Sequence, residues 1–183
     1  MELSNTSTLD FTKLFARATR DVIQDTTGQQ IEVSKSAMSI SGIQMIGEIG
    51  TFVSFKGDYS GIMVLNFEGA AALEIVVNSL IKMGLPEEDT PKHHSSDEVI
   101  GSMGELANQV VGRCRSLVEE KFDLSASAHI PSVVPIGVPI ALTMATRNPA
   151  QLECVRVSFS TEKRNRFYME LALEPMLLSP LNV

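Results

Sequence analysis

The sequence predicts a single α/β domain of the α+β kind, in which one helix-and-hairpin unit occurs twice with pseudo-twofold symmetry. The chain has 183 residues, 44% of them hydrophobic, so residues 1–183 can bury the core of one domain. Two long segments have helical periodicity, and each is followed by broken strand segments and then by a hairpin. We therefore expect a largely antiparallel sheet with two long helices covering one face, in approximate halves 10–84 and 96–174.

The first half begins with "LDFTKLFARATRDVIQDTTG", whose apolar residues recur at helical spacing. Asp10 is the expected N-cap of this helix and Gly28 its expected end. The later stretch "GTFVSFKGDYSGIMVLNF" is rich in β-branched and aromatic residues, and "GDYSG" predicts the turn of a hairpin. A further helix is expected over "AALEIVVNSLIKMG", ending at Gly84. Residues 85–95 are a linker by composition, with proline, charge and serine but no periodicity.

The second half begins with a long helix over residues 96–122, and Ser95 with Glu98 fits a capping box at its start. The next segment, "LSASAHIPSVVPIG", is broken by proline. Strands are expected in "VPIALTMATRN", "LECVRVSFS" and "RFYMELALEP", and the last two form a hairpin whose polar tip, residues 162–166, is expected in solvent. The sequence assigns no role to the linker or to an insertion at residues 147–151.

Composition excludes several classes of function. The formal net charge of −7 argues against nucleic acid as a partner, because phosphate binding needs a basic surface. The start of the chain has no signal-peptide pattern and no run of about 18 apolar residues occurs, so we expect a cytoplasmic protein without a membrane partner. Cys114 and Cys154 are expected to be reduced core thiols. His93 and His94 are expected in a solvated loop and His129 in a structural role, so no metal site is predicted.

The helix over residues 96–122 carries the functional signal. At about 100° per residue, one side collects the apolar residues expected in the core, Val99, Met103, Leu106, Val110, Cys114 and Leu117. The opposite side, called here the polar face, collects Gly101, Glu105, Asn108, Gly112 and Arg115.

Two glycines flank the pair Glu105 and Asn108, which lie one turn apart on this face. Glycine inside a helix costs about 1 kcal/mol relative to alanine. Gly101 and Gly112 leave a shallow notch on either side of the pair, and a partner could approach the backbone closely there. In the alternative interpretation, the glycines pack against another helix of the same protein, and the two polar residues contact only solvent.

The stretch "EVIGSMGELANQVVGR", followed by "LSASAHIPSVV", resembles the CheC/CheX/FliY family of chemotaxis phosphatases. The family pattern has Glu, then Asn three residues later, then Pro twenty-three residues beyond, and Glu105, Asn108 and Pro131 match this spacing. The stretch "FKGDYSGIMVLNFEGAAALEIVVNSLIKMG" is similar to the family's hairpin and helix, so the resemblance extends over about residues 11–173.

The chain departs from the family pattern in two places. The family usually has Asp or Ser four residues before the Glu, whereas this chain has Gly101 there and Ser102 one place off. The helix of the first half, "FARATRDV", has no ExxN motif, and in this it is similar to CheX-type members with one site per subunit.

The resemblance implies a phosphatase that acts on the aspartyl phosphate of a CheY-like response-regulator receiver domain. In that role the Asn108 amide, both donor and acceptor, would orient the attacking water, and Glu105 would accept a hydrogen bond from a receiver lysine. Gly101, Gly112 and Arg115 would contact the receiver. The resemblance also implies a homodimer with no cofactor of its own, since Mg²⁺ is expected on the receiver.

Two other interpretations stay open. The chain could be a non-catalytic module that binds a receiver or a flagellar protein, and Gly101 favours this reading because it replaces the family's Asp or Ser. The chain could also be a dimeric scaffold whose polar face is buried in its own assembly.

Overall fold

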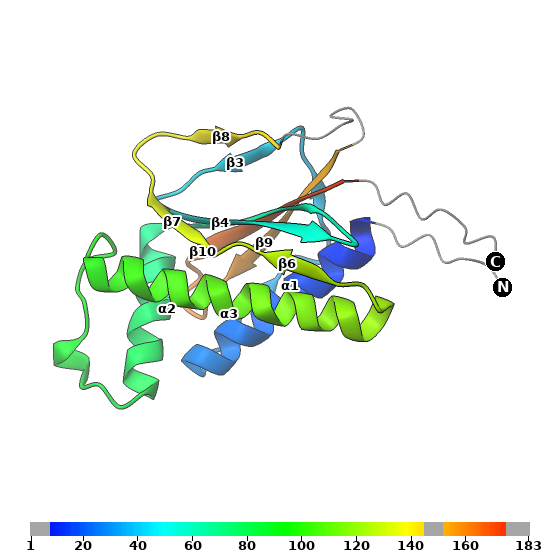
Figure 1. The fold of residues 1–183 in the computed structure, drawn as a ribbon. Helices are drawn as coiled ribbons and strands as arrows, with labels where there is room; N and C mark the ends of the chain where they lie inside the picture. Colours follow the sequence, from blue (N-terminus) through cyan, green and yellow to red (C-terminus); the bar gives the residue numbers. More distant parts are fainter. Residues whose placement is uncertain (1–7, 145–151, 175–183) are drawn as a thin grey trace, which may run out of the picture.

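The structure is a computed structural model that describes residues 8–144 and 152–174. Helices lie on one face of a large antiparallel sheet, and a small two-stranded sheet lies on its other face (Figure 1). The insertion at residues 147–151 lies outside the described residues.

The helices occur where the apolar periodicity predicts them. The described part of the chain has three α-helices and one short 3₁₀ turn: α1 (Thr8–Thr27), α2 (Gly69–Lys82), η1 (Glu87–Asp89) and α3 (Asp97–Phe122). Helices α1 and α3 are the two long helices expected from the sequence. The shorter α2 packs against both of them and against the sheet.

Two of the predicted helix starts are wrong by one or two residues. Helix α1 begins before Asp10, which lies in the first turn, where a carboxylate interacts favourably with the positive end of the helix. The N-cap of α3 is Ser96, not Ser95: its backbone is extended and its Oγ accepts a hydrogen bond from the Val99 N–H at 3.4 Å. The Ser96 cap is formed with the backbone N–H of Val99, so it does not require Glu or Gln at that position as the capping box does. The predicted end at Gly28 is confirmed by its φ of 78°.

Within residues 8–144 and 152–174, the strands form two sheets in which every pairing is antiparallel. The strands are β1 (Glu32–Val33), β2 (Met38–Ser39), β3 (Ile43–Met45), β4 (Ile49–Gly57), β5 (Gly61–Phe67), β6 (Ala126–Ala128), β7 (Ser132–Pro135), β8 (Ile140–Leu142), β9 (Glu153–Ser160) and β10 (Arg166–Leu173). The large sheet has the order β1-β9-β10-β5-β4-β6, with β2 also on β9 and β7 also on β4, while β3 pairs with β8. The predicted hairpins are therefore β4-β5 and β9-β10, and they lie side by side at the centre.

The order of the strands confirms the pseudo-twofold repeat. Helix α1 corresponds to α3, and each of the strands β1 to β5 corresponds to one of β6 to β10. The first two strands of each half pair with the hairpin of the other half, because β1 and β2 lie on β9 while β6 and β7 lie on β4. The third strands, β3 and β8, pair with each other. The two halves thus exchange their short strands.

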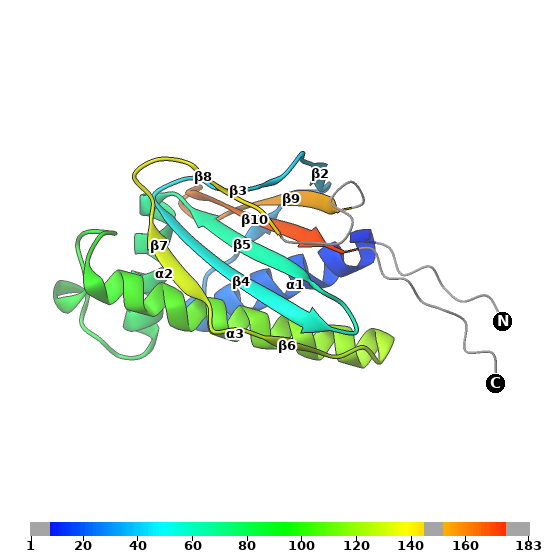
Figure 2. The ribbon, with the colours of Figure 1, turned by 45° about the horizontal axis from the view of Figure 1, so that its top comes forward.

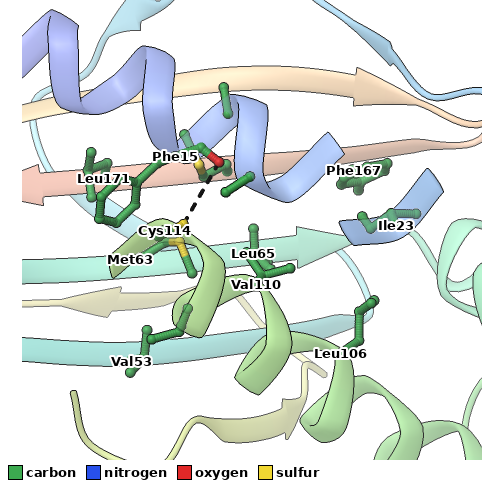
Figure 3. Packing of buried hydrophobic residues seen from close by; sticks show 14 of the residues in the cluster. Phe15, Ile23, Val53, Met63, Leu65, Leu106, Val110, Cys114, Phe167 and Leu171 are labelled. Atoms are coloured by element: carbon green, nitrogen blue, oxygen red, sulfur yellow. Dashed lines mark hydrogen bonds between the residues drawn. The ribbon is translucent and has the colours of Figure 1, made fainter. Parts of the chain in front are cut away.

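The main core lies between the sheet and helices α1 and α3 (Figure 3). All six residues predicted for the core face of α3 are buried, none more than 5% exposed. The aromatic rings of Phe67 and Phe159 stack on Phe167, with centroid distances of 5.1 and 4.8 Å. This burial fixes the rotation of α3 about its axis, so its polar face is turned to solvent.

Buried polar groups attach strand β3 to the other face of the large sheet. Glu170 and Asn66 lie on the central strands and are both fully buried. Glu170 accepts a hydrogen bond from the Gln44 N–H at 2.7 Å and pairs with Arg156 at 2.6 Å. The Asn66 side chain accepts from the Ile46 N–H and donates to the Gln44 carbonyl, both at 2.8 Å. The buried side chains of Glu170 and Asn66 are therefore both hydrogen-bonded, as burial of a polar group favours.

The linker and the second hairpin tip are held more firmly than their composition suggests. His94, predicted to lie in a solvated loop, is 3.4 Å from Glu48, whose other carboxylate oxygen accepts from the Gly69 N–H at the start of α2. Buried Glu74 accepts hydrogen bonds from Thr161 at 2.5 Å and Asn165 at 2.7 Å, which anchors the base of the tip. Residues 162–164 at the tip itself are exposed, as predicted.

Candidate functional site

The polar face of α3 carries the candidate site. Glu105 and Asn108 are both exposed, and neither side chain makes a hydrogen bond or an ion pair within the described residues. The carboxylate and the amide are therefore free to bind a partner or a water molecule. Their common orientation follows from the i, i+3 spacing and from the buried face behind them.

The three glycines of α3 have different surroundings. A Cβ added at Gly101 or Gly112 would meet no neighbouring atom within 4 Å, so both glycines leave open space beside the polar pair. A Cβ added at Gly104 would lie 3.3 Å from a methyl group of Val133, so this glycine allows β7 to approach the helix. Internal packing accounts for Gly104, and within this chain it does not account for Gly101 or Gly112.

Arg115, predicted to contact a partner, has a structural contact. Its Nε donates a hydrogen bond to the Ala126 carbonyl at 2.6 Å and so attaches β6 to α3. With the contact between Gly104 and Val133, this bond shows that the segment β6-β7 runs antiparallel along α3 (Figure 2). Arg115 as a whole remains exposed.

The same two contacts bracket Asn108 on the helix side and Ile130 and Pro131 on the strand side. From Gly104 to Arg115, α3 rises about 16 Å at 1.5 Å per residue. From Ala126 to Val133, a fully extended chain spans about 23 Å. Asn108 lies about a third of the way from Gly104 to Arg115, and residues 130 and 131 lie about a third of the way from Val133 to Ala126, in the same stretch of the interface. Pro131 is partly buried, whereas the Ile130 side chain is 88% exposed. The spaced proline of the sequence motif therefore lies in the segment that runs along the part of α3 carrying the asparagine.

A cleft of about 300 Å³ lies on the opposite side of the polar pair, between α1, α2 and α3. Its apolar lining residues are Ile75, Val76, Met83 and Leu106. Its polar lining residues are Thr26, Ser79, Ser102, Glu105 and Gln109. Glu105 thus belongs both to the polar face and to the rim of the cleft, and Ser102 points into the cleft.

Sequence reasoning missed the cleft and Ile130. The cleft is built from three helices that are far apart in the chain, so no single stretch of sequence shows it. Two local signals were available: Met83 is apolar beside the helix-ending Gly84, and Ile130 is apolar in a short loop before a proline. Both side chains are exposed, Met83 at 72%. Single exposed apolar residues are common, so these signals gain meaning only from the structure, in which Met83 lines the cleft with Glu105 and Ile130 lies in the segment along α3.

The remaining reactive side chains lie elsewhere. Burial raises the pKa of the Cys114 and Cys154 thiols, which disfavours the thiolate form. His129 lies 3.0 Å from the Ser54 hydroxyl, and its backbone N–H bonds to the Ser54 carbonyl, in keeping with the structural role expected of it. Among residues 8–144 and 152–174, no three His, Cys, Asp or Glu side chains lie together as a metal site would require. No described helix is long and apolar enough to cross a membrane.

The comparisons with known proteins agree with the fold. The family model described as "Protein of unknown function (DUF3334)" matches residues 4–177. No curated protein matches the chain.

Solved structures match over nearly the whole chain. A chemotaxis protein CheX from Desulfovibrio desulfuricans has a TM-score of 0.69 and 19% identity over 90% of this chain and 99% of that one. A CheC-like superfamily protein from Shewanella sp. PV-4 has a TM-score of 0.73 and 19% identity over 92% of this chain and 99% of that one. The CheX in a CheX–CheY–BeF₃–Mg²⁺ complex from Borrelia burgdorferi has a TM-score of 0.62 and 16% identity, covering 90% and 98% of the two chains. These structures confirm the fold that the sequence resemblance implied.

Proposed function

Since the chain belongs to the DUF3334 family and has the fold of CheX and CheC-like proteins, we propose that it stimulates hydrolysis of the aspartyl phosphate on a CheY-like receiver domain. The observation that carries this proposal is the free pair Glu105 and Asn108, exposed between two open glycines on α3. The solved complex of CheX with CheY and BeF₃ supports it, because the CheX of that complex has the same fold. This role would place the protein in the cytoplasm.

The chemistry needs positioning more than new reactive groups. A water oxygen attacks the phosphorus, the bond to the aspartate oxygen breaks, and the products are the free carboxylate and inorganic phosphate. The Asn108 amide can accept a hydrogen bond from that water and donate one to a phosphoryl oxygen, which holds the water in line without removing its proton. Positioning of this kind can lower a barrier by several kcal/mol.

Glu105 has a docking role in the proposal. Its carboxylate would accept a charge-assisted hydrogen bond from a lysine of the receiver, which would fix the orientation of Asn108 over the phosphate. The metal ion is expected on the receiver, and we propose no cofactor for this chain. The glycines let the receiver approach the α3 backbone closely enough for both contacts.

One alternative function has an observation in its favour. Gly101 stands where the resembled family usually has Asp or Ser, so the chain lacks a polar group that other members carry. Ser102 does not replace it, because Ser102 lines the cleft and not the open notch. A module that binds the receiver without accelerating its dephosphorylation is therefore the second candidate function.

Autodephosphorylation of phosphorylated CheY-type receivers from the source organism tests the proposal directly. The intact protein is expected to accelerate loss of phosphate from one of them. Asn108→Ala is expected to reduce the stimulated rate by about 100-fold, because the water loses its orientation. Glu105→Ala is expected mainly to raise the concentration needed for half-maximal stimulation.

Circular dichroism of each variant provides the control, since both side chains are exposed and the fold is expected to persist. If Asn108→Ala is as fast as the unchanged protein, the catalytic assignment is wrong. If the unchanged protein binds a receiver but does not accelerate its dephosphorylation, the binding-module function is supported instead.

A further inference from the structure

We infer that the receiver is held by apolar contacts on both sides of the polar pair, with Ile130 as one contact and the cleft beside Met83 as the other. This inference rests on the proposed function and adds to it the residues that determine recognition. It also names the chemistry of the partner surface: a cationic side chain flanked by apolar side chains.

Ile130 is the first contact. Its side chain is 88% exposed in the loop between β6 and β7, within the segment that runs along α3 from Arg115 to Gly104. Helical geometry puts Asn108 on the edge of the polar face nearer to this loop, about 40° from the direction of Gly104, which faces β7. A receiver seated over Asn108 would therefore cover Ile130 as well. Pro131 restricts the backbone next to Ile130, which reduces the entropy lost on binding.

The cleft is the second contact. Glu105 lies on the other edge of the polar face, about 100° from the Gly104 direction, and forms part of the cleft rim. Met83 projects into solvent at the end of α2 and can adapt its shape to an apolar side chain. A volume of about 300 Å³ admits a side chain of the partner, not a large domain.

The charge of the cleft indicates what enters it. None of its nine lining residues is cationic, and Glu105 is the single carboxylate among them. An apolar side chain of the partner would contact the apolar lining of the cleft, and a neighbouring lysine or arginine would pair with the Glu105 carboxylate. An acidic partner surface would be repelled by Glu105.

The two contacts are also expected to stabilise the docked complex. Apolar groups around a hydrogen-bonding pair exclude bulk water once they are covered, which strengthens the bonds that the pair makes. In this arrangement Glu105 and Asn108 would form the polar centre, and Ile130 and Met83 the flanks. The flanks are expected to contribute to affinity and not to the chemical step.

Binding of receivers loaded with beryllofluoride and Mg²⁺, measured by calorimetry, tests the inference with the variants Ile130→Asp and Met83→Gln. Ile130→Asp is expected to weaken binding by about ten- to a hundredfold, the range for losing one buried isoleucine contact. Met83→Gln, which keeps the length of the side chain, is expected to weaken binding by about three- to tenfold. The dephosphorylation rate at saturating protein is expected to stay within about twofold of the unchanged value, because neither residue reaches the phosphate.

Two variants serve as matched controls. Ile130→Leu keeps the apolar contact and is expected to bind normally. Leu9→Asp introduces the same charge at another exposed apolar residue, 50% exposed at the start of α1. The ring stacking of Phe11 on Phe122 puts this end of α1 beside the far end of α3, about 20 Å from Asn108, so Leu9→Asp is expected to bind normally.

The outcomes separate this inference from the proposed function. If Ile130→Asp binds as tightly as the unchanged protein while Asn108→Ala still loses activity, the inference is wrong and the function stands. If the unchanged protein binds none of the loaded receivers, both fail. If Ile130→Asp instead halves the molecular mass in light scattering, the surface joins two copies of this chain, and the receiver is not its occupant.

Discussion

Tyr59 shows how strongly the tertiary structure changes the behaviour of one residue. It lies in the turn of the first hairpin, yet it is 2% exposed and its ring contacts Phe11 and Phe55 at centroid distances of 5.1 and 5.4 Å. Its hydroxyl has no hydrogen-bond partner within the described residues. Burial, and next the nearby Cys114, raise the pKa of Tyr59 from 10.0 to about 12. The ring stabilises the core, while the buried hydroxyl costs free energy.

Tyr59→Phe is expected to raise the free energy of unfolding by about 1 kcal/mol at pH 7, because it removes an unpartnered buried hydroxyl. The two proteins are expected to differ more in alkali. The pKa is higher in the folded state than in the unfolded state, so ionisation of the tyrosine favours unfolding. The free energy of unfolding therefore falls as the pH rises from about 10 towards about 12. The unchanged protein should therefore lose on the order of 2 kcal/mol more than Tyr59→Phe across this window.

Urea unfolding at pH 7 and at pH 11 measures both effects. The buried Cys114 thiol, whose pKa is also raised, adds an alkaline loss to both proteins, so the difference between them is the relevant quantity. Equal losses in the two proteins would contradict the account of Tyr59.

At the scale of the element, helix α3 combines a core face, a strand contact and an open face. Its glycines differ in the same way. Gly104 lets β7 approach the helix closely, whereas a Cβ at Gly101 or Gly112 would meet no neighbouring atom. A helix former at an open glycine should therefore stabilise the protein, whatever it does to function.

Gly112→Leu is expected to raise the free energy of unfolding by about 1 kcal/mol, because leucine is the better helix former and a Cβ at this position meets no neighbouring atom within 4 Å. The same variant is expected to lower stimulated dephosphorylation by at least about tenfold, because its side chain would keep the receiver from the α3 backbone. Thermal unfolding and the dephosphorylation assay measure the two effects on one sample.

Gly104→Ala is the matched comparison within the same helix. Its added methyl group would lie 3.3 Å from Val133, so most of the gain in helix propensity should be lost to crowding. If Gly112→Leu unfolds the chain or breaks its oligomer, the open glycines serve packing between copies, as the scaffold interpretation requires.

At the scale of the whole molecule, the two halves share one hydrophobic core. Residues of α1, α2, α3 and both central hairpins belong to a single buried cluster. The strand exchange joins the halves further, since neither hairpin keeps its short strands. We therefore infer one domain, with its approximate halves at 10–84 and 96–174 and the linker at 85–95 between them.

We expect this domain to form a twofold dimer, as the resemblance to CheX-type proteins implies, and the contact would then be isologous. Apolar side chains are exposed away from the polar face of α3: Ile140 of β8 is 37% exposed and the preceding Val138 is 71% exposed. Strand β8 lies on the side of the large sheet opposite the helices, so a dimer formed there would leave α3 free (Figure 1). Light scattering at micromolar concentration should give about twice the chain mass of 19.9 kDa. A mass equal to one chain would contradict the dimer.

The sequence predicted much of this molecule because helical and strand periodicities are local. Val99, Met103 and Val110 recur at the spacing of one helix face, so their burial could be deduced without knowing what they contact. The same spacing turned Glu105 and Asn108 to the opposite side, and both are exposed in the structure. The turn of each hairpin was also predicted from its own few residues, since turn chemistry depends on neighbours in the chain.

The tertiary structure alone decided which distant segments meet. A short strand carries no local mark of its partner, so nothing in "LSASAHIPSVV" indicates that β6 and β7 pair with β4 of the other half. That pairing lays the segment with Ile130 along α3 and gives the Arg115 side chain a carbonyl to bind. Likewise, the cleft beside Glu105 exists because three helices converge, with Met83 supplied from α2. Hydrogen bonds and packing between residues far apart in sequence depend on the whole fold, and so the surroundings of the polar pair could be known only from the structure.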